Sequence, residues 1–170
     1  MFLCYTFNSP QGLNIVIAGL LPAGVECELM AAKTFKLEVV TPDKIVYSDN
    51  AVVSVVIPGS EGYFGVLAGH APMMAEMSIG ELNLKHEDGI TDDMFICGGF
   101  VEVFENTVTV LAHTAELGCD IDEDRAQQSL QRAKDRMAQS DSNVDYARAQ
   151  ASLQRAMARL SIVRKRTSQS

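Results

Sequence analysis

Residues three positions apart, Asp122 and Arg125, are the first candidates for binding chemistry. Side chains at that spacing share one face of a helix. A guanidinium is a planar fork that fits phosphate oxygens. Arg132 lies one heptad beyond Arg125, and Arg155 with Arg159, four positions apart on a second predicted helix, completes a basic lining. The competing interpretation is that acid–base pairs at a helix start are caps and solvated charges.

Independent catalysis has little support. The turn Gly59–Gly62 lacks the G-x-S-x-G form of a nucleophile elbow, and Gly98-Gly99 lacks the GK[ST] of a P-loop. No cysteine forms a CxxC pair or has a histidine at ligand spacing, so neither a zinc site nor a disulfide framework is expected. We therefore expect no catalytic residue, no metal and no required cofactor. The histidines are His70, His86 and His113, and the cysteines are Cys4, Cys27, Cys97 and Cys119.

The composition excludes several classes of protein. The chain has 170 residues, of which 47% are hydrophobic and 21% charged, as in an ordinary globular protein. A net charge of -8 and 6% aromatic residues argue against a nucleic-acid partner. No apolar run reaches the ~20 residues of a membrane span. Residues 33–113 hold 4 bases against 12 acids, whereas residues 114–170 hold 10 against 8, which suggests two modules.

Residues 1–30 differ from the rest of the chain. The apolar run Leu13–Leu21 is too short to span a bilayer, and the first basic residue of the chain is Lys33. A secretory signal needs a positive n-region and a transit peptide needs arginines. Met30 is placed like an ordinary start before the first strand. We expect residues 1–30 to be a disordered or non-native extension.

Residues 31–116 carry the pattern of a β domain. Phe35, Leu37 and Val39 alternate with polar residues, and Ile45 and Tyr47 continue that pattern after a turn. The cluster Pro58–Gly62 predicts a turn, and Gly98-Gly99 is expected to separate two strands. Many short strands at close spacing favour an antiparallel β-sandwich or barrel.

Residues 117–170 change to a helical period. Apolar residues recur at steps of three and four, which predicts two amphipathic helices. Asp120 is expected to cap the first helix, and Ser140–Asn143 to break the chain and cap the second. Both seams are rich in alanine and bury little area, so the hairpin is expected to be weakly held and able to move. The seams are Ala126, Leu130, Ala133 and Met137, then Tyr146, Ala149, Leu153, Ala156, Leu160 and Val163. The fold class predicted is α+β with two modules, an N-terminal antiparallel β-sandwich and a C-terminal antiparallel helical hairpin.

An ordered set of motifs resembles the epsilon subunit of the F-type ATP synthase. The resemblance covers about residues 33–163. Its segments are Gly59–Gly62, Gly65–Leu67, Gly69–Pro72, Gly98–Val103, Thr107–Ala112 and Asp145–Ala147. The resemblance implies a non-catalytic central-stalk subunit that binds the gamma subunit, sits on the ring of c subunits and turns with the rotor. Its hairpin would extend toward the alpha and beta subunits and inhibit ATP hydrolysis. The expected location is the cytoplasmic face of a bacterial inner membrane, as a peripheral subunit.

The same resemblance implies particular site residues. The segment Ile121–Ala126 is similar to the I/L-D-x-x-R-A motif with which some family members bind ATP, so a regulatory ATP is expected. The predicted nucleotide-binding residues are Ile121, Asp122, Arg125, Ala126, Arg132, Arg155 and Arg159. Tyr63, in the loop after Gly62, and His70 are the predicted contacts with the c-ring. His70 can equally be a turn histidine bonded to its own loop. Arg155, Arg159 and Arg164 are the predicted inhibitory contacts with the beta subunit.

Two alternatives belong to other classes. One is a free-standing adaptor, a β-sandwich with a helical partner-binding arm. The other is an ATP-sensing regulatory protein built on residues 121–126. Co-purification discriminates them, because a rotor subunit brings down gamma and the c-ring, an adaptor brings unrelated partners, and a sensor binds ATP as an isolated monomer.

Overall fold

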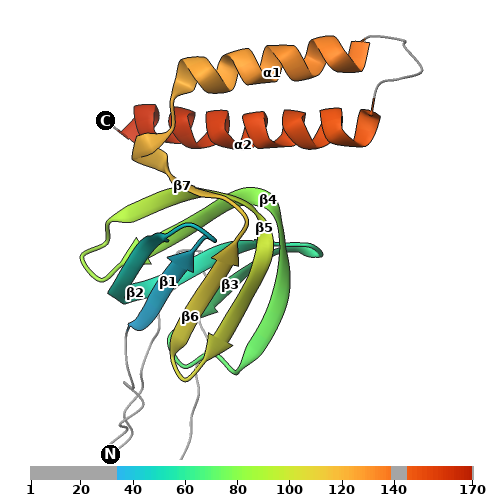
Figure 1. Cartoon of the computed structure of the whole chain (residues 1–170). Helices are drawn as coiled ribbons and strands as arrows, with labels where there is room; N and C mark the ends of the chain where they lie inside the picture. Colours follow the sequence, from blue (N-terminus) through green and yellow to red (C-terminus); the bar gives the residue numbers. More distant parts are fainter. Residues whose placement is uncertain (1–33, 139–144, 170) are drawn as a thin grey trace, which may run out of the picture. The chain divides into compact units, whose positions relative to one another are not determined.

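Strands and two long helices make up the described part of the chain, residues 34–138 and 145–169 of the computed structural model (Figure 1). The predicted extension over residues 1–30 lies outside the described residues. The strands and both helices belong to one unit, residues 32–170. The strands are β1 (Phe35–Val40), β2 (Ile45–Gly59), β3 (Gly62–Leu67), β4 (Met73–His86), β5 (Thr91–Phe104), β6 (Thr107–Ala112) and β7 (Ala115–Leu117). A 3₁₀ turn η1 (Gly118–Asp120) leads to α1 (Glu123–Ala138) and α2 (Tyr146–Gln169).

The strands curl into a barrel-like sandwich. Their order is β1-β6-β5-β4-β2-β3, and β1 also pairs with β2, so five strands close a ring. The pair of β1 and β6 is parallel, and the other pairs are antiparallel. The predicted antiparallel β-sandwich followed by a helical hairpin is confirmed, with β1 and β6 as the one parallel pair among the described strands. Ring closure brings the first strand beside β6, which runs in the same direction.

Long strands replace several predicted short ones. β5 runs without a break through Gly98 and Gly99, which have φ of 64° and 116°. At these glycines the strand kinks and changes partner, since Met94–Ile96 pairs with β7 and Gly99–Phe104 pairs with β6. A Cβ on Gly99 would lie 2.0 Å from the Leu111 carbonyl oxygen. The glycines therefore permit a bulge inside one strand rather than ending it.

The predicted alternation in β1 is confirmed. Phe35, Leu37 and Val39 are at most 2% exposed and point into the core. The extension of that pattern to Ile45 is wrong, because Ile45 is 62% exposed, whereas Tyr47 is partly buried and packs against the core. A register shift between Val39 and Val40, where β1 pairs with Ile45, ends the alternation that buries every second residue.

Each helix is capped by the aspartate that precedes its first residue. Asp122 Oδ1 accepts the Arg125 N–H at 2.9 Å, and Asp145 Oδ1 accepts the Arg148 N–H at 3.0 Å. Both bonds have the N-cap-to-N3 spacing that satisfies a free donor of the first turn. Asp120 lies in η1, so the prediction that it caps α1 is wrong. The assignment of the second cap to Ser140–Asn143 is wrong as well, although that segment itself lies outside the described residues.

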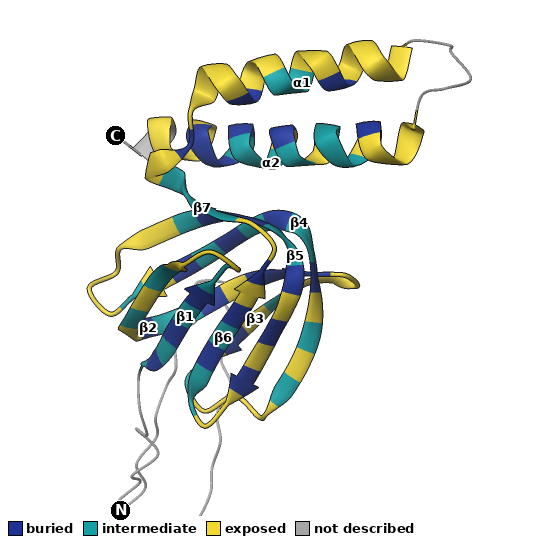
Figure 2. Cartoon of the chain, viewed as in Figure 1, coloured by how far each residue is buried: buried dark blue, intermediate teal, exposed yellow. Residues whose placement is uncertain are grey.

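The two helices pack through small side chains, as predicted. Figure 2 shows buried positions at intervals along both helices. The buried positions of this seam are Ala126, Ala133, Ala149, Ala156, Leu160 and Val163. Met137 and Tyr146, placed in the seam by the sequence, are 37% and 52% exposed. They lie toward the ends of the helices that meet the connecting segment, where less of the partner helix covers them.

A second face of α2 packs against the β domain. Phe95 of β5 forms a cluster with Ile121, Ile162 and Val163, and all four are at most 5% exposed. Ile79, Cys97 and Ala158 pack around this cluster. The hairpin is therefore anchored by large apolar side chains in addition to the alanine seam, which the sequence pattern did not indicate.

Candidate functional site

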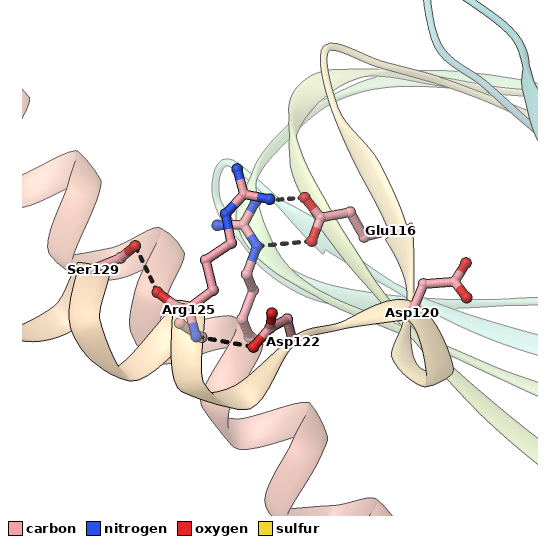
Figure 3. A pocket seen from close by; sticks show the side chains of 7 residues that line it. Glu116, Asp120, Asp122, Arg125 and Ser129 are labelled. Carbon is pink, nitrogen blue, oxygen red and sulfur yellow. Dashed lines mark hydrogen bonds and ion pairs between the residues drawn. The ribbon is translucent and has the colours of Figure 1, made fainter.

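A pocket of about 270 Å³ lies where β7, η1 and the two helices meet (Figure 3). The described lining comes from seven residues, five of them charged. They are Glu116, Asp120, Asp122, Arg125, Ala126, Ser129 and Arg159. Residues from four separate elements thus reach one small polar space.

The guanidinium of Arg159, on one side of this pocket, is hydrogen-bonded to Glu116. Its Nε donates to Glu116 Oε2 at 2.8 Å and its Nη2 donates to Glu116 Oε1 at 2.7 Å. The same guanidinium lies over the Phe95 ring, with Cζ 3.9 Å from the ring centroid. The Arg159 hydrogen bond is the largest cause that lowers the pKa of Glu116, and the charge of Arg125 adds to it. Glu116 therefore stays ionised and holds Arg159 by two charge-assisted bonds.

Arg125 supplies the second guanidinium of the lining. Its backbone is fixed at both ends, because its N–H bonds Asp122 and its carbonyl oxygen accepts the Ser129 hydroxyl at 2.8 Å. Its side chain is exposed at the pocket. A planar cation in this position can bind an anionic group such as phosphate. The carboxylates of Asp120 and Asp122 oppose an anion, so any phosphate must approach from the Arg125 side.

The structure brings together four of the seven predicted nucleotide-binding residues: Asp122, Arg125, Ala126 and Arg159. Ile121 is 5% exposed and packs in the cluster beneath α2. Arg132 and Arg155 are not among the residues that line the pocket. Each donates to a serine three positions earlier, Arg132 to Ser129 at 3.0 Å and Arg155 to Ser152 at 2.9 Å.

Glu116 was missed by the sequence analysis. It is the only acidic residue between Thr107 and Cys119. An isolated charge at the end of an apolar stretch was the available signal, since such a charge needs a partner when it is partly buried. The partner, Arg159, is 43 positions away, and no local pattern indicates it.

The two predicted c-ring contacts lie at opposite ends of β3. Tyr63 belongs to β3, paired with Pro58, so its placement in a loop is wrong. Its hydroxyl oxygen accepts the Glu81 N–H at 3.4 Å, and the Glu81 carboxylate pairs with Lys165 of α2. His70 follows the other end of β3, with Nδ1 2.8 Å from the Ala71 carbonyl oxygen. This geometry fits the interpretation of His70 as a turn histidine bonded to its own loop.

The three arginines predicted for inhibition differ in their surroundings. Arg159 is bound to Glu116, and Arg155 is partly buried and bonded to Ser152. Arg164 is exposed and lines a groove of about 370 Å³ between the helices. The groove is lined by Leu130, Lys134, Met157, Leu160, Ser161 and Arg164.

The described residues offer neither a membrane-spanning helix nor a metal-binding cluster. Among residues 34–138 and 145–169, no helix has the length and apolar character to cross a membrane. In the same part of the chain, no three histidine, cysteine or acidic side chains are grouped so as to hold a metal ion.

Family comparisons match both modules. Residues 34–118 match the model of the ATP synthase delta/epsilon chain β-sandwich domain, and residues 120–164 match that of its long α-helix domain. The chain is similar to the ATP synthase epsilon chain of Desulfatibacillum aliphaticivorans, with 54% identity over 59% of this chain and 71% of the relative. It is also similar to the epsilon chain of Nitratidesulfovibrio vulgaris, with 51% identity over 63% of this chain and 78% of the relative.

A solved structure has the same fold. It is a chain of the Euglena gracilis mitochondrial ATP synthase, in a complex of OSCP, F1 and c-ring. The TM-score is 0.67 at 24% identity, and the match covers 74% of this chain and 79% of that chain.

Proposed function

Because the chain belongs to the ATP synthase delta/epsilon chain family as a non-catalytic, epsilon-type subunit, we propose that it works in the central stalk of the rotor. In this role it binds the gamma subunit, contacts the c-ring and turns with both. The complex performs the chemistry, and this chain transmits and regulates rotation. The proposed location is the cytoplasmic face of a bacterial inner membrane, in agreement with the bacterial relatives.

The observation that supports this role best is an apolar patch on the outer face of the sheet. Phe100 of β5 and Leu111 of β6 lie directly opposite each other and are 51% and 52% exposed. They border a groove of about 290 Å³ that also includes Val40, Pro42 and Ala112. Exposed apolar patches of this kind mark interaction surfaces. The gamma subunit is the proposed occupant.

Co-purification with gamma tests this assignment. Leu111→Glu places a charge in the patch and is expected to abolish capture of gamma. Leu67→Glu is the matched control, because Leu67 is 61% exposed on β3, outside the groove. Equal capture of gamma by both variants would contradict the patch assignment. Failure of the unsubstituted chain to bind gamma under any condition would favour the adaptor or ATP-sensor alternatives.

The hairpin provides the proposed regulation. In the docked arrangement, Arg159 is held by Glu116 and Phe95. Inhibition of ATP hydrolysis then requires α2 to leave the β domain and present Arg155, Arg159 and Arg164 to an acidic segment of the beta subunit. A two-state element of this kind needs a docked state whose contacts are few enough to break.

Regulatory ATP is the proposed ligand of the pocket. Arg125 would take a phosphate and Asp122 would accept from the adenine or the ribose, while Glu116 keeps Arg159 in place. Titration of the isolated chain with ATP, followed by NMR, tests this. Arg125→Ala is expected to abolish the response, and Arg132→Ala, outside the lining, to retain most of it. If both variants lose the NMR response to ATP equally, the two arginines act only through their positive charge, and Arg125 is not a specific phosphate ligand.

The loop that contains His70 is the proposed contact with the c-ring. That loop lies beside the β5–β6 turn, since the Gly69 N–H donates to Asn106 Oδ1 at 2.9 Å. Tyr63, at the other end of β3, is 61% exposed although its hydroxyl oxygen accepts the Glu81 N–H, so it is proposed as a second contact. Cross-linking to the c-ring from His70→Cys and from Tyr63→Cys, each prepared separately, is the expected result, and absence of cross-linking from either variant would reject that contact.

A further inference from the structure

Four polar side chains from three strands converge beside the β4–β5 turn. His86 ends β4, Asp92 lies near the start of β5, and Tyr47 and Asp49 lie on β2. His86 Nδ1 is 3.0 Å from Asp49 Oδ2, and His86 Nε2 is 3.0 Å from Asp92 Oδ2. The Tyr47 hydroxyl is 3.3 Å from Asp49 Oδ2 and 3.5 Å from His86 Nε2. The imidazole is only 17% exposed.

The protons of this cluster can be counted. An ionised carboxylate only accepts hydrogen bonds, so two contacts of 3.0 Å require a hydrogen on both ring nitrogens of His86. The Ala51 N–H lowers the pKa of Asp49, and the Asn50 N–H, Tyr47 and His86 lower it further. Burial, together with the charge of Asp49, raises the pKa of Tyr47, which keeps its hydroxyl hydrogen. With Asp49 and Asp92 ionised, both carboxylate contacts are hydrogen bonds when each ring nitrogen of His86 carries a hydrogen.

We propose that Tyr47, Asp49, His86 and Asp92 form a proton-operated clamp, in which protonated His86 ties the start of β5 to β2 and loss of one proton releases Asp92. In neutral His86 whose Nδ1–H still donates to Asp49, Nε2 has no hydrogen. Its lone pair then faces the negative carboxylate of Asp92, which repels it. The Tyr47 hydroxyl can then turn from Asp49 and donate to Nε2. Asp92 is 53% exposed, so its side chain can turn to water at small cost.

The remaining charged groups near His86 do not replace this contact. Lys85, the residue before His86 on β4, is exposed and points to the opposite side of the strand. Glu87 and Asp88 are exposed in the turn, and Asp88 Oδ1 accepts the Ile90 N–H at 2.9 Å. β5 continues from Asp92 to Phe95, the ring that Arg159 covers. The clamp thus holds the strand on which α2 docks.

Thermal unfolding of the full chain between about pH 5 and about pH 8, where histidine changes charge, tests the clamp. The Tm of the unsubstituted chain is expected to fall by about 2–4 °C as the pH rises. His86→Gln and Asp92→Asn are expected to lose this slope, because an amide at position 92 can donate to a neutral ring nitrogen. His70→Gln removes a histidine bonded only to its own loop and is expected to keep the slope. A slope that persists in His86→Gln overturns the proposal.

An NMR titration keeps the test decisive if a variant folds poorly. In the unsubstituted chain, the His86 ring signals and the Asp92 and Tyr47 signals are expected to shift with one midpoint. Hydrogen exchange at the Asp92 amide, corrected for its intrinsic pH dependence, is expected to increase severalfold above that midpoint. A His86 ring that titrates while Asp92 and Tyr47 stay unchanged would show that the contacts carry no coupling, and the clamp would be rejected.

Discussion

Arg159 of α2 binds Glu116 of β7 through two hydrogen bonds of 2.8 and 2.7 Å, while its guanidinium covers the Phe95 ring at 3.9 Å. One side chain thus joins the second helix to the last strand and to the centre of the docking cluster. Both partners are only partly exposed, at 23% and 34%. The relationship makes Arg159 a contact of the docked hairpin as well as a wall of the pocket.

Glu116→Gln is expected to weaken docking of α2. The amide loses the negative charge and one of two acceptor oxygens, and a partly exposed pair of this kind contributes about 1 kcal/mol. The distance distribution between spin labels on α2 and β4 measures the docked fraction. Glu61→Gln, in the exposed β2–β3 turn, is the control. An unchanged distribution in Glu116→Gln would show that the pair does not hold the helix.

Docking is expected to depend on acid pH through Glu116. The pKa of Glu116 is lowered in the folded chain from its ordinary value of 4.5, with Arg159 as the main cause. A lowered pKa contributes stability above the ordinary value, and that contribution is lost as the pH falls through the folded value. The docked fraction, followed by the same spin labels, should decrease below about pH 4.5. In Glu116→Gln this part of the pH dependence should be missing.

Gly118→Ala is expected to push α2 away from the β domain. An added Cβ would lie 2.9 Å from Ile162 Cγ2 and 2.8 Å from the Asp93 carbonyl oxygen. Overpacking of this kind costs about 1–3 kcal/mol, and moving the helix relieves it. Gly65→Ala is the matched control, because a Cβ there meets nothing within 4 Å. Denaturant unfolding with a helix-specific probe should show earlier loss of docking only in Gly118→Ala.

Ile162→Ala is expected to destabilise the docked hairpin by about 2–4 kcal/mol, since Ile162 is fully packed at 1% exposure. Met157→Ala, at 56% exposure on the same helix, removes a side chain of similar size and should cost far less. NMR signals of α2 and of the β domain, followed in denaturant, compare the loss of docking in the two variants. If both variants lose the same small amount of docking stability, Ile162 does not anchor α2, and the helix is held by the hairpin seam alone.

Glu116→Gln and Arg159→Ala are expected to change ATP hydrolysis of the reconstituted complex in opposite directions. The first releases Arg159 for the beta subunit and should deepen inhibition, whereas the second removes the proposed inhibitory cation and should relieve it. Both substitutions weaken docking of α2. If both change the rate of ATP hydrolysis in the same direction, docking strength alone explains the regulation, and the role of Arg159 at the beta subunit is contradicted. Arg148→Ala, an exposed change elsewhere on α2, is the control.

The sequence by itself determined the two modules, the buried face of β1, the alanine seam and most of the pocket's composition. Alternation and helical periodicity report which side of an element is buried, and Phe35, Ala133 and Ala156 follow them. They do not report what covers that side. Ring closure through a parallel pair, Phe95 under α2, and Glu116 with a partner 43 positions away were decided only by the tertiary structure. These depend on contacts between distant segments, whose geometry is set by the packing of the whole sheet and not by any local pattern.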